Sequence, residues 1–207
     1  MFYAILDERR VALLPILKNF QDRFYLAGGT SLALQLGHRD SIDFDFFTQE
    51  AIDTGKLFEE LREVFVGHEI LKTQEEKNTL TLVVDGSVKL SFFTHTYPLI
   101  RDSIRDEYLT LASLEDIACM KLSAITGRAT NKDYVDLYFL LEKFSLQDLL
   151  SFAEEKYPEL DTNLLLKSLV YFDDVVEEKI LFKNNKEVTF NDVKKRLGRE
   201  VKAFVDL

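Results

Sequence analysis

Apolar positions in the first half of the chain follow the two-residue period, or the short apolar runs, that are typical of β-strands. Four segments have this character: 23–27, 42–47, 79–84 and 87–93, and the segment 68–72 could be a further strand. Asp85-Gly86 separates the last two, and this pair is a strong signal for a β-hairpin. Helical spacing of apolar residues predicts helices at 7–20, 30–36 and about 53–65. The first half therefore predicts a mixed β-sheet flanked by helices.

After Pro98 the pattern changes to the three- and four-residue spacing of amphipathic helices. Ser113 fits the capping position of the first of them. Helices are predicted at 114–127, 131–144, 145–157, 161–172 and 189–207. The predicted fold class is α+β, with an N-terminal mixed sheet and its flanking helices followed by a C-terminal helical domain. We place the first domain at residues 1–112 and the second at residues 113–207.

The composition describes a packed globular protein of 207 residues, of which 46% are hydrophobic. No apolar run is long enough to span a membrane, so no membrane partner is expected. The single cysteine, Cys119, cannot form an internal disulfide, which fits a reducing compartment and a cytoplasmic location. The net charge of −10 argues mildly against long contacts with nucleic acid, although a local basic patch stays compatible with it.

Gly28-Gly29-Thr30 lies between the first predicted strand and the helix that follows it. Adjacent glycines let the backbone approach a ligand closely, and the N–H groups at the start of a helix attract anions. The segment is therefore a candidate phosphate-binding turn. An ordinary strand–helix turn with Thr30 as the helix cap has the same geometry, so both interpretations remain open.

The second predicted strand alternates acidic and apolar positions: Ile42, Asp43, Phe44, Asp45 and Phe46. Since the side chains of a strand alternate between its faces, the two carboxylates should share one face and the three apolar residues the other. Paired carboxylates repel each other unless a cation binds them, and their hard oxygens suit Mg²⁺ or Mn²⁺. With the glycine turn upstream, the pair predicts a metal site for phosphoryl transfer; the alternative is a solvated strand face.

Lys121 interrupts the apolar stripe of the predicted helix 114–127, where an ammonium group is costly unless it snorkels to water or meets an anion. Contact with a phosphate is the preferred interpretation, and Arg128 points the same way seven residues further on. Asp133 and Asp136 share a face of the next helix. Asp133 lies in the first turn, where the helix N-terminus stabilises a carboxylate, whereas Asp136 lies beyond it.

The sequences Gly-Gly-Thr, His-Arg-Asp-Ser and Asp-Phe-Asp, at 28–30, 38–41 and 43–45, resemble the first motif of DNA-polymerase-β-like nucleotidyltransferases. With Lys121, Arg128 and the segment 132–137, the pattern resembles the AbiEii/AbiGii toxin family over roughly residues 24–142. The resemblance implies Mg²⁺-dependent transfer of a nucleoside monophosphate from an NTP to an acceptor hydroxyl. It also implies an RNA acceptor such as a tRNA end, and a toxin role in a bacterial toxin–antitoxin or abortive-infection system with an antitoxin partner.

The residue patterns and the resemblance together define a predicted active site. Asp43 and Asp45 would bind the metal and act in catalysis with Lys121, which contacts phosphate, and Asp136, which completes the site. A wider set would bind the nucleotide: Gly28, Gly29, Thr30, Arg39, Ser41, Lys89, Arg128 and Asp133. We expect the glycine turn to face the same cleft as Asp43, and Lys121 and Asp136 to point into that cleft.

One position departs from the polymerase-β-like pattern. Many such enzymes carry a third carboxylate on a neighbouring strand, and the polar face of 87–93 holds Lys89 and Ser91 instead. Either Asp136 substitutes for it, or Lys89 contacts phosphate there, or metal binding is weaker. Two other functions therefore stay open. The acidic charge favours a nucleotidyltransferase that acts on a small molecule, and Ser91 favours a nucleotide-binding pseudoenzyme without turnover.

Overall fold

The structure is a computed structural model that describes residues 1–128 and 130–206. The chain forms two compact units. The first comprises Met1–Gln35, Ser41–Pro98 and Asp102–Ala112, and the second comprises Leu36–Asp40, Leu99–Arg101 and the chain from Ser113 onward. The chain therefore passes between the units several times, whereas the sequence analysis placed a single boundary between residues 112 and 113.

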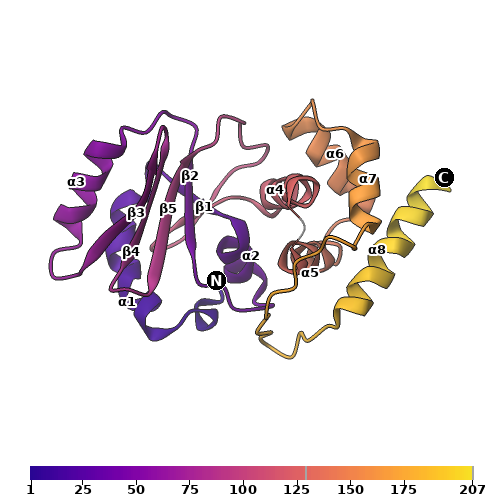
Figure 1. Ribbon diagram of the computed structural model, residues 1–207, viewed down its shortest axis with the longest axis horizontal. Helices are drawn as coiled ribbons and strands as arrows, with labels where there is room; N and C mark the ends of the chain where they lie inside the picture. Colours follow the sequence, from indigo (N-terminus) through magenta and orange to yellow (C-terminus); the bar gives the residue numbers. More distant parts are fainter. Residues whose placement is uncertain (129, 207) are drawn as a thin grey trace. The chain divides into compact units, whose positions relative to one another are not determined.

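A seven-stranded mixed sheet forms the centre of the first unit, in the order β3-β4-β5-β2-β1-β7-β6 (Figure 1). The strands are β1 Tyr25–Ala27, β2 Phe44–Thr48, β3 Ile70–Glu76, β4 Thr79–Val84, β5 Val88–Thr94, β6 Ile104–Arg105 and β7 Thr110–Leu111. β2 pairs in parallel with β5 and β1 with β7, and the other neighbours are antiparallel. The four predicted strands and the hairpin are confirmed, and the possible strand at 68–72 overlaps the start of β3. β6 and β7 were missed because two-residue strands leave no periodic pattern.

The first unit also contains α1, Glu8–Leu17, α3, Thr54–Val64, and nearly all of α2, Gly28–Leu36. The carboxylates of Asp7 and Asp53 cap α1 and α3 by accepting hydrogen bonds from backbone N–H groups of their first turns. These two helices cover one face of the sheet (Figure 1), over a core that includes Phe20, Phe24, Phe44, Phe46 and Phe92. The side chains on this face of β2 and β5 are buried in the core. The polar residues that alternate with them along each strand therefore face the other side of the sheet.

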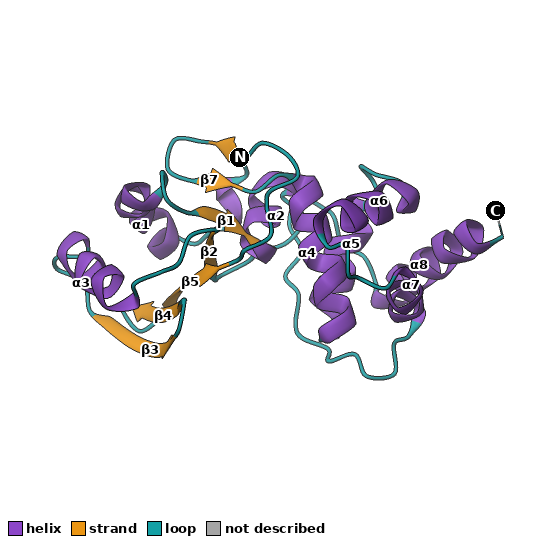
Figure 2. Cartoon of the chain, turned by 90° about the horizontal axis from the view of Figure 1, so that it is seen from above, coloured by secondary structure: helices purple, strands orange, loops and turns teal. Residues whose placement is uncertain are grey.

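The second unit is built from helices and loops, as the colours of Figure 2 show. Its helices are α4 Leu114–Gly127, α5 Asn131–Leu140, α6 Leu146–Lys156, α7 Thr162–Val170 and α8 Phe190–Val205. The sequence predicts all five, and α5 is the one that ends clearly earlier than expected. With the mixed sheet of the first unit, these helices confirm the α+β class. Within residues 1–128 and 130–206, no helix is long and apolar enough to cross a membrane.

Two short segments belong to the helical unit through contacts that the sequence pattern does not reveal. The Asp40 N–H donates to the carbonyl oxygen of Leu181 at 2.9 Å, in the long connection between α7 and α8. Backbone N–H groups of the segment 99–101 donate to the Asp116 carboxylate. That carboxylate also forms a fully buried ion pair with Lys156 at 2.7 Å. These partners lie far apart in sequence, so local periodicity carries no sign of them.

Candidate functional site

Asp43 and Asp45 lie at the start of β2, which runs beside β5. Asp45 is level with Ser91 in the parallel register, and the Asp43 carboxylate lies 3.9 Å from the Lys89 ammonium. Lys89 and Ser91 are two residues apart on one strand, so they face the same side of the sheet. The two carboxylates therefore lie on one face, which is the arrangement that the alternation predicts.

Ile42 does not share the buried face of Phe44 and Phe46, so this part of the prediction is wrong. Its side chain is 55% exposed, whereas the two phenylalanines are buried. β2 begins only at Phe44, and the irregular backbone before it is held by Arg10, whose Nε donates to the Ile42 carbonyl oxygen at 2.6 Å. Another Arg10 nitrogen donates to the Ser87 carbonyl at 3.0 Å. Arg10 thus fixes the starts of β2 and β5 together, and with them the positions of the polar residues.

The glycine turn lies directly beside Asp45. β1 and β2 are antiparallel neighbours in which Ala27 pairs with Asp45, and Gly28 follows with φ +69°. A Cβ atom on Gly28 would lie 3.4 Å from a carboxylate oxygen of Asp45. The positive φ favours glycine here, whereas a Cβ atom at this distance would be in ordinary van der Waals contact with Asp45. The turn and the carboxylates are therefore adjacent parts of one surface in the first unit.

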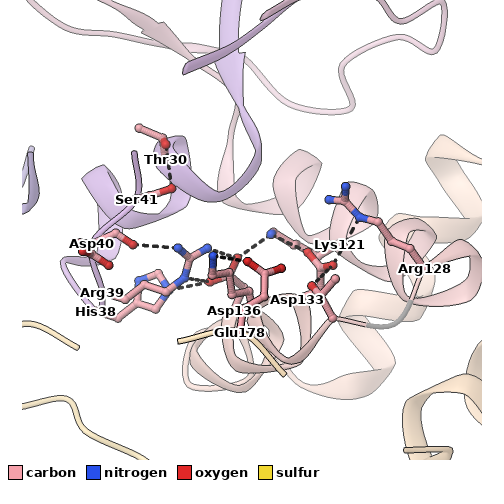
Figure 3. A network of polar contacts seen from close by, with 12 residues as sticks. Thr30, His38, Arg39, Asp40, Ser41, Lys121, Arg128, Asp133, Asp136 and Glu178 are labelled. Atoms are coloured by element: carbon pink, nitrogen blue, oxygen red, sulfur yellow. Dashed lines mark hydrogen bonds and ion pairs between the residues drawn. The ribbon is translucent and has the colours of Figure 1, made fainter. Parts of the chain in front are cut away.

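Thr30 ties the turn to the segment that carries the aspartates. Its hydroxyl contacts the Asp43 carbonyl oxygen and lies 2.8 Å from Ser41 Oγ (Figure 3). Since a carbonyl oxygen only accepts, Thr30 donates there, and the second contact joins the two hydroxyls. The interpretation of Thr30 as the helix cap is wrong, because α2 begins at Gly28 and Thr30 lies inside it. Its side chain instead positions the backbone of Asp43.

We predict that Gly28→Ala lowers both stability and metal binding. A left-handed φ costs a non-glycine residue about 1–2 kcal/mol, and the new methyl group would contact the Asp45 carboxylate. Gly86→Ala is the matched control, because Gly86 has φ +63° and nothing lies within 4 Å of its Cβ position. Thermal denaturation should show similar losses for both variants, and Mn²⁺ titration should show weaker binding for Gly28→Ala alone. Equal Mn²⁺ affinity in the two variants would contradict the prediction.

A second cluster lies inside the second unit, around Asp136 of α5 (Figure 3). Arg39 donates from Nε and Nη2 to the two Asp136 oxygens at 2.7 and 2.8 Å. The Lys121 ammonium lies 2.5 Å from Asp136 and 2.8 Å from Asp133, and His38 Nε2 lies 2.8 Å from Asp136. Asp136 is 0% exposed and the other four residues are also buried. The cluster is therefore a buried charge network in which two carboxylates balance one guanidinium and one ammonium group.

Burial and charge act in opposite directions on the ionisation of this network. Burial is the largest influence on Asp136 and opposes its charge, but Arg39, Lys121 and the His38 hydrogen bond outweigh it and hold the Asp136 pKa well below its usual range. Burial also lowers the pKa of His38, although its hydrogen bond to Asp136 acts the other way. His38 is therefore neutral at pH 7 and donates from Nε2, which leaves Asp136 as the ionised centre of the cluster.

The structure gives the charge of Lys121 a partner that the sequence analysis did not foresee. The preferred interpretation was a phosphate, with snorkelling to water as the alternative, whereas Asp133 and Asp136 compensate the ammonium inside the unit. A lysine has three N–H donors, so one remains beyond these two carboxylates. Arg128 is 73% exposed and lies 3.6 Å from Asp133. That Lys121 and Asp136 point toward the Asp43 site stays a prediction.

Arg39 and His38 are the other two partners of Asp136 in this cluster. Arg39, which the sequence predicts to bind nucleotide, is buried and bidentate on Asp136. The place of His38 beside Asp136 was not predicted. A single histidine without a partner at a fixed spacing gives no sequence signal for such a contact.

The Asp43–Asp45 pair fits a hard divalent cation through the chemistry of its donors. In the described part of the chain, this pair included, no three or more His, Cys, Asp or Glu side chains are grouped so that they could hold a metal ion. Mg²⁺ is commonly bound through one or two carboxylates, with substrate phosphates and waters as its other ligands. Two carboxylates beside a glycine turn match that requirement. A cation bound here would take its other ligands from the phosphates of the substrate and from water.

Comparison with known proteins bears on the family and the fold of the chain. The family model described as "Nucleotidyl transferase AbiEii toxin, Type IV TA system" matches residues 13–205. A protein of Aquifex aeolicus (strain VF5), aq_aa25, is 36% identical in an alignment of 206 residues that covers 96% of this chain and 97% of that protein.

Among solved structures, MenT4, the nucleotidyltransferase toxin Rv2826c of Mycobacterium tuberculosis H37Rv, superposes with a TM-score of 0.66 at 17% identity. The superposition covers 95% of this chain and 82% of the MenT4 chain. JHP933 of Helicobacter pylori gives 0.58 at 21% identity, covering 96% and 92%. At these identities, the two structures show a likeness of fold.

Proposed function

The chain belongs to the AbiEii family of nucleotidyl transferase toxins, and from this premise we propose that it transfers a nucleoside monophosphate from an NTP to an RNA hydroxyl. The observation that carries the proposal is that the Gly28 turn lies next to Asp45: Ala27, just before the turn, pairs with Asp45 across β1 and β2, and a Cβ atom on Gly28 would lie 3.4 Å from the Asp45 carboxylate. A turn that presents backbone N–H groups and a carboxylate pair that suits Mg²⁺ or Mn²⁺ are the two parts that triphosphate binding requires.

The proposed reaction is a displacement at the α-phosphorus. The acceptor hydroxyl oxygen forms a bond to phosphorus, the bond to the bridging α–β oxygen breaks, and pyrophosphate leaves while the hydroxyl proton passes to water. Asp43 and Asp45 would hold the cation, which when bound neutralises phosphate charge and favours ionisation of the attacking hydroxyl. Gly28 and Gly29 would place their N–H groups against phosphate oxygens. Ser41 would support the turn through the hydrogen bond that it donates to Thr30.

The buried network of the second unit is proposed to position cationic groups for the phosphates. Lys121 has one N–H donor left after its contacts with Asp133 and Asp136, and Arg128 is exposed. In this proposal Asp136 acts through its partners: it holds Arg39 and Lys121 in place. Its own oxygens already accept from all three neighbouring donors, so it is a positioning residue for the nucleotide site.

A basic stripe on α8 supports RNA as the acceptor. α8 carries five basic and two acidic residues, in a chain whose net charge is −10. Lys195, Arg199 and Lys202 are exposed and follow the four- and three-residue spacing of one helix face. A shallow depression beside the last two of them is lined by Gly198, Arg199, Lys202, Ala203 and Asp206. A phosphate backbone is the ligand that such a stripe attracts on an otherwise acidic protein.

Neutralising the basic stripe should weaken RNA binding without affecting nucleotide binding. For the triple variant Lys195→Gln, Arg199→Gln and Lys202→Gln, the slope of log affinity against log salt should fall by about 2, since single strands contribute about 0.7 per phosphate contact. The measurement is filter binding of labelled RNA at several salt concentrations. The control removes the same charge from exposed lysines elsewhere in the unit: Lys143→Gln, Lys167→Gln and Lys179→Gln. If both triple variants lose RNA affinity equally, α8 has no specific part in binding.

The proposed activity is tested by incubating the protein with each α-³²P-labelled NTP, Mg²⁺ and total cellular RNA. Label is expected in RNA, with release of pyrophosphate. Label in a low-molecular-weight product would favour the alternative of a small-molecule acceptor, which the acidic net charge supports. Binding of NTP without any Mg²⁺-dependent consumption would establish a pseudoenzyme. We further propose that the activity is toxic in the cytoplasm and is neutralised by an antitoxin, so expression alone should arrest growth.

A further inference from the structure

Asp45 has polar neighbours at the same level on the next two strands of the sheet, and these would lie near the proposed cation. The register places Asp45 of β2 level with Ser91 of β5, and Ser91 level with Thr81 of β4. Ser91 is 1% exposed, and among the described residues its hydroxyl has no hydrogen-bond partner. A buried polar atom without a partner is uncommon and calls for an explanation. A neutral hydroxyl therefore occupies the position beside Asp45 where a further carboxylate would strengthen metal binding.

Lys89 lies on the same face, two residues before Ser91. Its ammonium is 3.9 Å from the Asp43 carboxylate, and both side chains are about half exposed. Two divalent cations would bring four positive charges to a face that offers two carboxylates and already carries this ammonium. The lysine repels a second cation and competes with it for Asp43. The same charge attracts a phosphate oxygen, so it favours the substrate while it disfavours another metal ion.

Asp136 does not make up for the missing carboxylate. Both of its oxygens are engaged by Arg39, and they also contact Lys121 and His38. Its side chain is fully buried. Releasing an oxygen to a metal would weaken the pairing of the buried Arg39 and Lys121, for which only Asp133 offers a further carboxylate, and this is strongly unfavourable. Of the three explanations that the sequence left open, contact between Lys89 and phosphate is the one that these contacts favour.

We propose that the Asp43–Asp45 site binds a single divalent cation and that the Lys89 ammonium contributes the positive charge on the phosphates that a second cation would otherwise bring. The proposal rests on the proposed function, because it assumes that NTP binds at this face. Ser91 then belongs to a neutral lining that leaves room for the substrate or a water molecule.

The test counts Mn²⁺ ions by electron paramagnetic resonance of the free ion, with α,β-methylene NTP analogues of all four bases present. The wild-type protein should bind one Mn²⁺ per chain. Lys89→Gln should keep that stoichiometry and weaken analogue binding by about tenfold or more, the cost of losing one charged hydrogen bond. Lys77→Gln, an exposed lysine of the same unit, is the matched control and should change neither value.

The outcomes separate this inference from the proposed function. Two Mn²⁺ ions per wild-type chain would overturn the inference while supporting metal-dependent transfer. No bound Mn²⁺ would overturn the metal site itself, and the inference with it. The double variant Lys89→Gln and Ser91→Asp should bind a second Mn²⁺ if the missing carboxylate is what limits the site. The wild-type count does not depend on the folding of this variant, so the inference stays testable even if a buried aspartate disrupts the sheet.

Discussion

Asp45→Asn is expected to lower the rate of nucleotide transfer by more than about 100-fold, because a residue that only orients a metal ligand already accounts for up to that much. The substitution keeps the shape of the side chain and removes the charge that a divalent cation needs. Asp45 is partly exposed beside Gly28, so the fold should tolerate the change. The measurement is incorporation of label from α-³²P-NTP, with the thermal midpoint recorded on the same preparation.

Glu50→Gln provides the control for Asp45→Asn. Glu50 is exposed just beyond the other end of β2, and its substitution changes the net charge of the protein by the same amount. It should leave both transfer and Mn²⁺ affinity unchanged. If Asp45→Asn transferred nucleotide as fast as this control, the proposed metal site would be wrong, and with it the assignment of the glycine turn.

Asp136→Asn is expected to destabilise the protein by about 3–5 kcal/mol, the usual cost of removing one partner from a buried ion pair. The amide would leave Arg39 and Lys121 buried with only Asp133 as a compensating charge. For a chain of this length, such a loss corresponds to a thermal midpoint lower by roughly 6–20 °C. Differential scanning calorimetry measures it directly.

Two comparisons show whether this loss comes from the buried network. Glu60→Gln breaks the exposed ion pair with Arg23 and should cost no more than about 1 kcal/mol. Adding Lys121→Met to Asp136→Asn should recover part of the loss, because it removes one uncompensated buried charge. An unchanged thermal midpoint with abolished transfer would instead mean that Asp136 acts directly in the reaction, as the family resemblance first implied.

The contribution of Asp136 to folding stability depends on pH, and its direction follows from the lowered pKa. The folded pKa of Asp136 lies well below its unfolded value, so the unfolded chain binds the proton more readily. The stabilisation by Asp136 is therefore complete above about pH 4, the unfolded value, and is lost as pH falls toward the folded value. The stability difference between the wild-type protein and Asp136→Asn should accordingly shrink as the pH is lowered below about 4.

The sequence by itself determined the features that depend on neighbours along the chain. Alternation placed Asp43 and Asp45 on one face, with Phe44 and Phe46 buried behind them, because the side-chain period of a strand is local. Asp85-Gly86 fixed the hairpin, since both residues adopt the left-handed backbone that this turn needs. The helices of the second unit followed from their apolar spacing and capping residues in the same way.

Only the tertiary structure decided which groups meet across long stretches of chain. Arg39 and Asp136 are 97 positions apart, and nothing in the local pattern of either segment pairs them. Their contact turned an expected phosphate-binding arginine and an expected catalytic aspartate into one buried network. Likewise, the position of Ser91 beside Asp45 depends on strand order and register. Periodicity encodes which face of an element is buried, whereas the partner on that face is chosen by packing of the whole chain.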